Sequence, residues 1–200
     1  MQARTETTKS FLRLTQRIRV PAGFFVLPAM LVFAHPTRSS LLLGVAIAAL
    51  GLALRAWASG YLRKNERLTT SGPYSFTRNP LYLGTLILGT GAAICTGSIW
   101  LVVLFAALYS TIYLPVIIAE VDTMRAMFPV DYDDYSRRVP LLLPRIGTPY
   151  RAPDLQSRPN AGAEAGRFDI SLYLRNREYR AALGFAAITA LMLLKMLLLG

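Results

Sequence analysis

Residues 41–62 read LLLGVAIAALGLALRAWASGYL. Arg55 is the single charged side chain among these 22 residues, and nearly all the others are apolar or small. A helix needs roughly 20 consecutive apolar residues to cross the hydrocarbon core of a bilayer. The stretch therefore predicts a transmembrane helix, and it makes the expected fold class an all-α, integral membrane helical bundle.

Three further apolar segments extend this bundle in both directions along the chain. Residues 81–114 are long enough for two spans that divide near residues 97–98, and residues 181–199 form a last span. Residues 20–34 contain two prolines, so they span the bilayer only together with the basic residues before them. We expect about five transmembrane helices. A cleaved signal peptide is the alternative for the first segment, but its prolines and its lack of a small-residue cleavage site oppose this.

The composition agrees with a membrane protein of one domain. Of the 200 residues, 54% are hydrophobic and 16% are charged, whereas about 25% are charged in an ordinary soluble domain. His35 and Cys95 are each the only residue of their type. This excludes a disulfide framework and any zinc or haem site that needs two such ligands from this chain. Its chemistry is therefore metal-free or depends on a borrowed cofactor.

The net charge of +11 is concentrated in alternate loops. Five basic residues precede the first span, four lie between positions 63 and 78, and ten arginines lie between 125 and 180. By the positive-inside rule, the N-terminus and both long basic loops of this multi-pass chain are cytoplasmic and the C-terminus lies outside. The charge thus indicates topology and contact with anionic membrane lipids, and no nucleic-acid partner.

Residues 65–84, NERLTTSGPYSFTRNPLYLG, are the most unusual part of the chain. A simple connection between two helices needs about 2–8 residues. Gly72-Pro73 and Asn79-Pro80 predict two turns, the second at a helix start. Together with the aromatic side chains and the arginine, such a loop can hold a small charged molecule with a planar base. The alternative is an aromatic belt at the membrane interface.

Glu120 is a second candidate, because it ends an apolar run at a depth where a carboxylate is costly and is usually paired. We expect it to pair with Arg78 or with a bound cation, unless it only marks the water boundary. The helix that carries it should kink at Pro115 and stop before Pro129. We interpret the nearby aspartates as a solvated face: Asp122, Asp131, Asp133 and Asp134.

The region before the last span divides into two parts. Residues 147–166 are rich in Gly, Pro and Ala without periodicity, and they predict a loop. Residues 167–180 interleave apolar side chains with arginines, and they predict an interfacial helix.

Two separated motifs carry a resemblance to a known family. The first comprises LTTSGPY at 68–74 and RNPLYLG at 78–84, and the second comprises Glu120 and YDDYSRRVP at 132–140. They resemble the integral-membrane methyltransferases typified by isoprenylcysteine carboxyl methyltransferase and the phospholipid N-methyltransferases. The resemblance covers about residues 54–144. It implies S-adenosylmethionine as cofactor, bound by cytoplasmic loops, and methyl transfer to a lipid or other apolar small-molecule acceptor.

With this resemblance, we expect residues 1–200 to form a single membrane domain. Its parts are a basic cytoplasmic leader (1–19), a methyltransferase-like cofactor region (54–144), a cytoplasmic loop with the interfacial helix (145–180) and the last span (181–199).

The matching positions imply cofactor-binding residues and assign no catalytic residue. These are the entry segment Glu66, Arg67, Leu68 and Thr69, the Gly-x-Tyr aromatic Tyr74, the stretch Arg78, Asn79, Pro80, Leu81 and Tyr82, and Glu120. The resemblance implies that Glu120 binds the methionine ammonium or the ribose hydroxyls. Arg78 then binds the carboxylate of the cofactor or a lipid phosphate.

The chain departs from the family pattern at several positions. Asn79 replaces a histidine, Val121 replaces a second glutamate and Pro129 replaces a glycine. Val116 occupies the place of an arginine that contacts substrate in the carboxyl methyltransferases, so a prenylated-cysteine carboxylate is a poor candidate acceptor.

Two other interpretations stay open. One is a catalytically inactive membrane scaffold of the same fold, and the other is a small transporter or a sterol-reductase-like membrane enzyme. Few ionisable residues lie in the later spans besides Arg55 and Lys195, which opposes transport. The sequence gives Arg55 no partner.

Overall fold

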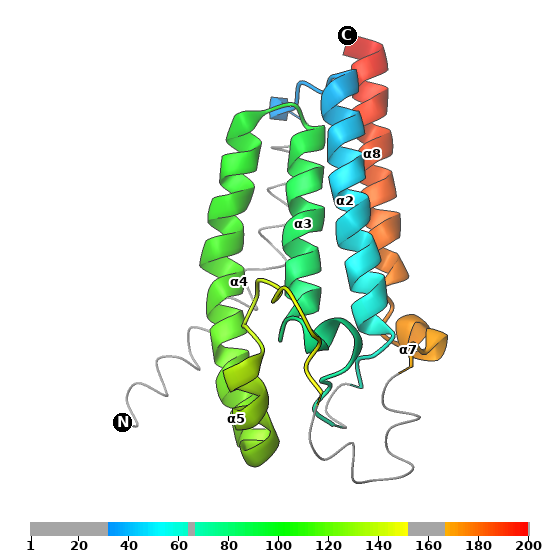
Figure 1. Cartoon of the computed structure of the whole chain (residues 1–200). Coiled ribbons are helices and arrows are strands. Elements are labelled where there is room, and N and C mark those ends of the chain that lie inside the picture. The colour runs from blue at the N-terminus through cyan, green and yellow to red at the C-terminus, as the bar shows by residue number, and fades with distance from the viewer. Residues whose placement is uncertain (1–31, 64–66, 152–166, 200) are drawn as a thin grey trace. The chain divides into compact units, whose positions relative to one another are not determined.

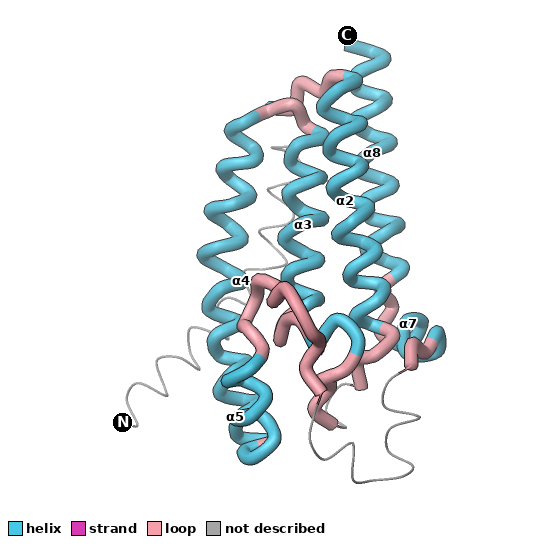
Figure 2. The backbone as a smooth tube through the Cα atoms, viewed as in Figure 1, coloured by secondary structure: helices cyan, strands magenta, loops and turns pink. Residues whose placement is uncertain are grey.

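The computed structural model describes residues 32–63, 67–151 and 167–199 (Figure 1, Figure 2). Within these ranges every regular element is a helix and no strand is present, which confirms the all-α fold class. The predicted first span at 20–34 lies almost entirely outside the described residues. The basic leader at 1–19 and Glu66 lie outside them as well.

Three helices of the described chain are long and apolar enough to cross a membrane: α2 (Arg38–Ser59), α4 (Ile99–Met127) and α8 (Tyr179–Leu199). Helix α3 (Pro80–Cys95) is apolar but has only 16 residues. These helices coincide with four of the five predicted spans, including the division of the long apolar segment near residues 97–98.

The helix ends follow local sequence signals. At the start of α2, the Ser40 amide donates to Thr37 Oγ1 at 3.1 Å and the Thr37 amide donates to Ser40 Oγ at 2.9 Å, a reciprocal capping arrangement. Helix α4 continues through Pro115 and ends at Met127, in agreement with the predicted stop before Pro129, and α5 (Pro129–Arg138) begins at that proline.

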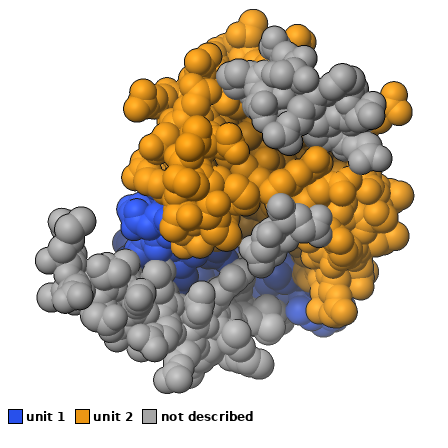
Figure 3. Space-filling view, turned by 90° about the horizontal axis from the view of Figure 1, so that it is seen from below, with its two compact units in different colours: residues 1–48, 89–122, 186–200 blue, residues 49–88, 123–185 orange. Residues whose placement is uncertain are grey.

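The chain forms two compact units, coloured separately in Figure 3. The first comprises residues 1–48, 89–122 and 186–200, and the second comprises residues 49–88 and 123–185. In each unit, glycines allow the backbones of α2 and α3 to approach closely. A Cβ on Gly44 would lie 2.6 Å from the Gly91 carbonyl oxygen, and one on Gly51 would lie 2.8 Å from that of Gly84.

The predicted interfacial helix is shorter than expected. Helix α7 spans only Ile170–Arg175, with Asp169 accepting a hydrogen bond from the Ser171 amide at 2.8 Å. This bond lowers the pKa of the Asp169 carboxyl. The chain then breaks before α8, and Arg177 has a left-handed φ of 55°. Ile170 and Leu174 are exposed and Leu172 is buried, so α7 keeps the predicted amphipathic character.

Candidate functional site

The loop between α2 and α3, residues 60–79, contains a short 3-10 helix that fixes its shape. Residues 72–75 form the 3-10 helix η1 (Gly72–Ser75), and Ser75 Oγ donates to the Gly72 carbonyl oxygen at 2.7 Å. Gly72 has φ +60°, and a Cβ there would lie 2.8 Å from the Tyr61 ring. Both the conformation and the available space therefore require glycine. This turn places Tyr74 in a buried position, with 7% exposure.

A second segment, residues 140–150, is hydrogen-bonded to this loop and follows α5 in the chain (yellow in Figure 1). The bonds that join the two segments run from the Arg78 amide to Pro140 O (2.9 Å), from the Arg145 amide to Phe76 O (2.9 Å), from the Tyr150 amide to Ser75 O (3.1 Å) and from Thr77 Oγ1 to Leu142 O (2.8 Å). Backbone groups that would otherwise need water are thus satisfied inside the protein. The loop therefore has a defined conformation, although most of it lacks regular secondary structure.

Two buried tyrosines, Tyr135 and Tyr150, pack against the loop and hold it in place. The Tyr135 hydroxyl donates to the Tyr74 carbonyl oxygen at 2.6 Å, and the rings of Tyr135 and Tyr150 lie 5.3 Å apart. The Tyr150 hydroxyl donates to Asp134 at 2.9 Å. Burial and this hydrogen bond raise the pKa of Tyr150 to about 12, and burial raises that of Tyr135 as well. Both phenols therefore stay protonated at neutral pH and act as donors that position the loop.

Asp134 departs from the prediction of a purely solvated face. Besides Tyr150, it accepts a hydrogen bond from Arg138 Nε at 3.0 Å, and its side chain is 38% exposed. Asp133 agrees better with that prediction, because its ion pair with Arg125 joins two largely exposed side chains.

Arg78 belongs to the loop, and its side chain contacts α5. Its Nη1 donates to the Tyr132 hydroxyl at 3.1 Å, and its guanidinium carbon lies 5.8 Å from the centre of the Tyr132 ring. Its Nε is buried and has no partner among the described residues. An unsatisfied buried donor costs about 1–3 kcal/mol. The geometry therefore leaves one donor of Arg78 without an acceptor among the described residues, and this donor is available to a ligand.

Asn79 has a structural bond at the position of the family histidine. Its Nδ2 donates to the Leu141 carbonyl oxygen at 3.0 Å, so its amide nitrogen helps to hold the 140–150 segment. Pro80 begins α3 as predicted. Leu81 and Tyr82 are half-buried in the first turn of this helix.

The remaining predicted site residues lie in several places. Arg67, Leu68 and Thr69 are half-buried and form no strand, and Thr69 Oγ1 lies 3.5 Å from the Tyr61 carbonyl oxygen. Glu120 is half-buried in the part of α4 that belongs to the first unit, whereas Arg78 belongs to the second. The pairing of Glu120 with Arg78 stays a prediction.

The structure supplies the partner of Arg55 that the sequence did not. Its Nη2 forms an ion pair with Glu178 Oε2 at 2.7 Å, and its Nη1 donates to the hydroxyl of Thr85. The side chains of Arg55 and Glu178 are 20% and 12% exposed. The two residues are 123 positions apart. The one signal in the sequence was a carboxylate that directly precedes the last span, at the depth where a buried arginine needs a counter-ion.

A known protein family matches the part of the chain that contains the loop. Residues 39–130 match the phospholipid methyltransferase family. The predicted resemblance to membrane methyltransferases is therefore confirmed over α2, the loop, α3 and α4. The phospholipid methyltransferase match begins earlier than the predicted region 54–144 and ends before the tyrosines of α5, which the structure nevertheless packs against the loop.

Two curated proteins are similar to this chain over part of its length. It is 37% identical over 107 residues to the nickel-cobalt-cadmium resistance protein NccN of Alcaligenes xylosoxydans xylosoxydans. It is 39% identical over 109 residues to the cobalt-zinc-cadmium resistance protein CzcN of Cupriavidus metallidurans. Each alignment covers 52% of this chain and 48% of the relative, so the chain spans about half the length of the curated relatives it matches. No solved structure matches.

Proposed function

We propose that this chain is a membrane methyltransferase that transfers the methyl group of S-adenosylmethionine to a lipid or other apolar small-molecule acceptor. One observation carries the proposal: the segment matched by the phospholipid methyltransferase family contains an ordered loop in which Arg78 Nε is buried and has no partner among the described residues. A free guanidinium donor suits a carboxylate such as that of the methionine part of the cofactor.

The proposed cofactor site keeps the residues that the resemblance implies. They are Glu66, Arg67, Leu68, Thr69, Tyr74, Arg78, Asn79, Pro80, Leu81, Tyr82 and Glu120. Arg78 would bind the cofactor carboxylate, and Glu120 the ammonium group or the ribose hydroxyls. Asn79 would contribute its carbonyl oxygen, since its amide nitrogen donates to Leu141.

The chemistry requires alignment more than acid–base catalysis by the protein. The bound cofactor supplies a methyl group on a positively charged sulfur, which an acceptor atom displaces in line. The residues of the chain contribute by binding the cofactor, by orienting it and by excluding water from the site. We propose that the cofactor enters from the cytoplasm, on the side of the basic loops, while the acceptor arrives from the bilayer.

The relatives bear names that refer to metal resistance. The described residues contain no group of three or more histidine, cysteine or acidic side chains that could hold a metal ion. The proposal for this chain concerns methyl transfer.

The inactive scaffold is the competing interpretation, because Asn79 and Val121 replace two acidic or titratable residues of the family. Purified protein incubated with methyl-labelled S-adenosylmethionine and total membrane lipid distinguishes the two. We expect a labelled lipid. Cofactor binding without a labelled product would favour the scaffold, and the absence of both would contradict the proposal.

A further inference from the structure

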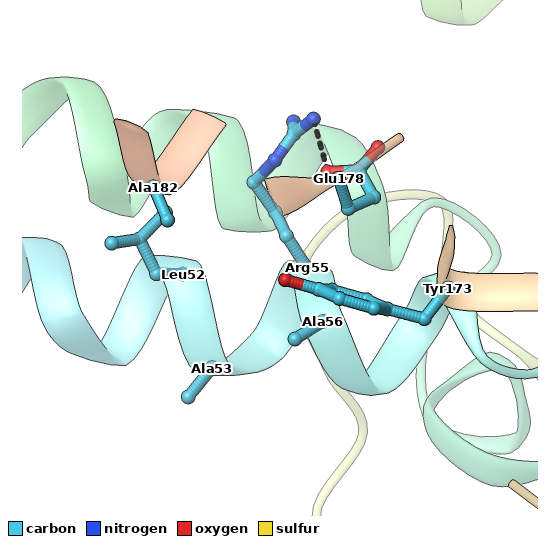
Figure 4. A pocket seen from close by; sticks show the side chains of 7 residues that line it. All are labelled: Leu52, Ala53, Arg55, Ala56, Tyr173, Glu178 and Ala182. Carbon is cyan, nitrogen blue, oxygen red and sulfur yellow. Dashed lines mark hydrogen bonds and ion pairs between the residues drawn. The ribbon is translucent and has the colours of Figure 1, made fainter. Parts of the chain in front are cut away.

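The ion pair between Arg55 and Glu178 lines a cavity of about 230 Å³ that belongs entirely to the second unit (Figure 4). Arg55 reaches it from α2, Glu178 from the residue before α8, and Tyr173 from α7 (Figure 4). The rest of the lining is apolar: Leu52, Ala53, Ala56 and Ala182. Apolar walls with a few convergent polar groups are typical of a ligand-binding site.

The polar groups around the cavity have hydrogen-bonding capacity that the described protein does not use. Arg55 Nε is buried and has no partner in the part of the chain that the structure describes. The ion pair uses Glu178 Oε2, and the second carboxylate oxygen of Glu178 and the Tyr173 hydroxyl add an acceptor and a hydroxyl group to the same lining. A donor, an acceptor and a hydroxyl group that can do either thus lie around one space. This combination suits a polar ligand better than an empty apolar void.

The cavity is held in place by contacts that connect α7 to the end of α2. The Asn176 side-chain amide donates to the carbonyl oxygens of Ser59 and Leu62, at 3.0 and 3.3 Å. The Asp169 amide donates to the Gly60 carbonyl oxygen at 2.9 Å. These bonds satisfy the carbonyl group of Ser59, the last residue of α2, and those of Gly60 and Leu62 directly after it. They also fix the segment that carries Tyr173 and leads to Glu178, so the cavity is formed in advance of any ligand.

Size and surroundings indicate a headgroup and not a whole molecule. Pockets for drug-sized ligands measure roughly 300–1,000 Å³, and this cavity is smaller. Two of the helices that line it, α2 and α8, are candidate membrane spans. Leu50, Trp57 and Leu183, which are close in sequence to the lining residues on these helices, are exposed and apolar, and Arg180 is an exposed basic residue on the first turn of α8. A ligand that places a polar group here therefore has an apolar remainder in the bilayer.

Electrostatics restrict the charge of that headgroup. Arg55 and Glu178 compensate each other, so the polar wall has no net charge. A headgroup with a net charge would bring a third charge among lining residues that contain no further counter-ion for it. Arg177 and Arg180 flank Glu178 in the sequence, but they are exposed and do not line the cavity. A head that offers both an acceptor and a donor, with charges that cancel or are absent, satisfies Arg55, Glu178 and Tyr173 together.

We propose that this cavity binds the polar head of a membrane amphiphile that carries no net charge. This selectivity is opposite to what the net charge of +11 would favour at the protein surface, where anionic lipids should gather. The proposal uses none of the residues assigned to the cofactor, and it holds whether or not the chain transfers methyl groups.

Lipid competition tests the proposal. The full chain is purified and exchanged into vesicles with equal amounts of phosphatidylcholine, diacylglycerol and phosphatidylglycerol. Lipids that remain bound after extraction are then counted by native mass spectrometry. We expect retention of a zwitterionic or an uncharged lipid over the anionic one, and the relative amounts of the first two show which head the site takes. Preferential retention of phosphatidylglycerol by the parent protein would overturn the proposal.

The variant Glu178→Gln tests the electrostatic argument directly. It leaves Arg55 without its counter-ion, so selectivity should move toward phosphatidylglycerol by about tenfold or more. A purely structural ion pair would not change lipid selectivity. An unchanged ratio in a folded Glu178→Gln protein would therefore contradict the assignment.

Two variants keep the ion pair intact and remain informative if Glu178→Gln does not fold. Tyr173→Phe removes one hydroxyl and should weaken retention of the preferred lipid about 2- to 12-fold, the equivalent of one hydrogen bond. Ala56→Leu fills the cavity and should abolish selective retention. The matched control is Ala187→Leu, because Ala187 is exposed on α8 and does not line the cavity. Equal retention by Ala56→Leu and Ala187→Leu would place the lipid elsewhere.

Discussion

Arg78 provides the sharpest test of the proposed cofactor site. Its backbone amide donates to the Pro140 carbonyl oxygen at 2.9 Å and its Nη1 to the Tyr132 hydroxyl at 3.1 Å, while its buried Nε has no partner within residues 32–63, 67–151 and 167–199. The variant Arg78→Met keeps the backbone bond and most of the aliphatic stem. It removes the unsatisfied donor together with the positive charge.

The expected magnitude follows from these contacts. A hydrogen bond to a charged group contributes about 1.5–3 kcal/mol, so the loss of the Arg78 contact should weaken binding of S-adenosylhomocysteine about 10- to 150-fold. The free energy of unfolding of the unliganded protein should fall by less than the binding free energy does. Removal of the Tyr132 bond costs about 0.5–1.5 kcal/mol, but the substitution also removes the unsatisfied Nε donor.

Titration calorimetry and thermal melting of the same samples separate the two effects. Tyr132→Phe is the matched control, because it removes the protein partner of Arg78 but leaves the guanidinium group, and it should weaken binding only about 2- to 12-fold. If Arg78→Met binds the ligand as tightly as the parent protein, Arg78 does not contact the cofactor. If affinity and melting temperature fall together in both variants, Arg78 acts only by holding the loop.

Three further predictions concern the loop, the carboxylate in α4 and the orientation. Gly72→Ala should destabilise the protein by about 1–2 kcal/mol in chemical or thermal unfolding, since alanine does not readily adopt the left-handed φ of +60° there. Glu120→Gln should weaken cofactor binding about 10- to 150-fold in calorimetry, as for a lost bond to a charged group, whereas Asp133→Asn should have little effect. Cysteines at Thr70 and Thr148 should react with an impermeant thiol reagent only from the cytoplasmic side, and labelling from outside would reverse the proposed topology.

Most of the fold could be predicted because membrane helices are determined by local composition. An apolar stretch of sufficient length must satisfy its own backbone hydrogen bonds in lipid, which leaves a helix as the outcome. The division before α4 and the stop before Pro129 depend on Gly and Pro signals within a few residues. The break in the predicted 167–180 helix was missed, because it depends on Asn176 bonding to the end of α2, a contact that no local pattern reports.

The candidate site was only partly predictable, because its support comes from distant segments. The motif that contains Tyr74 and Arg78 could be recognised from adjacent residues. The hydrogen bond from Tyr135 to the Tyr74 carbonyl spans 61 positions, and the pair of Arg55 and Glu178 spans 123. Contacts between residues so far apart in the sequence do not follow from any local pattern. An arginine in an apolar span does imply a buried counter-ion, and the structure shows that its partner lies directly before the last span. Residues after the matched segment 39–130, among them Tyr135 and Glu178, therefore hold the loop and Arg55 in place. Experiments on the loop alone would miss them.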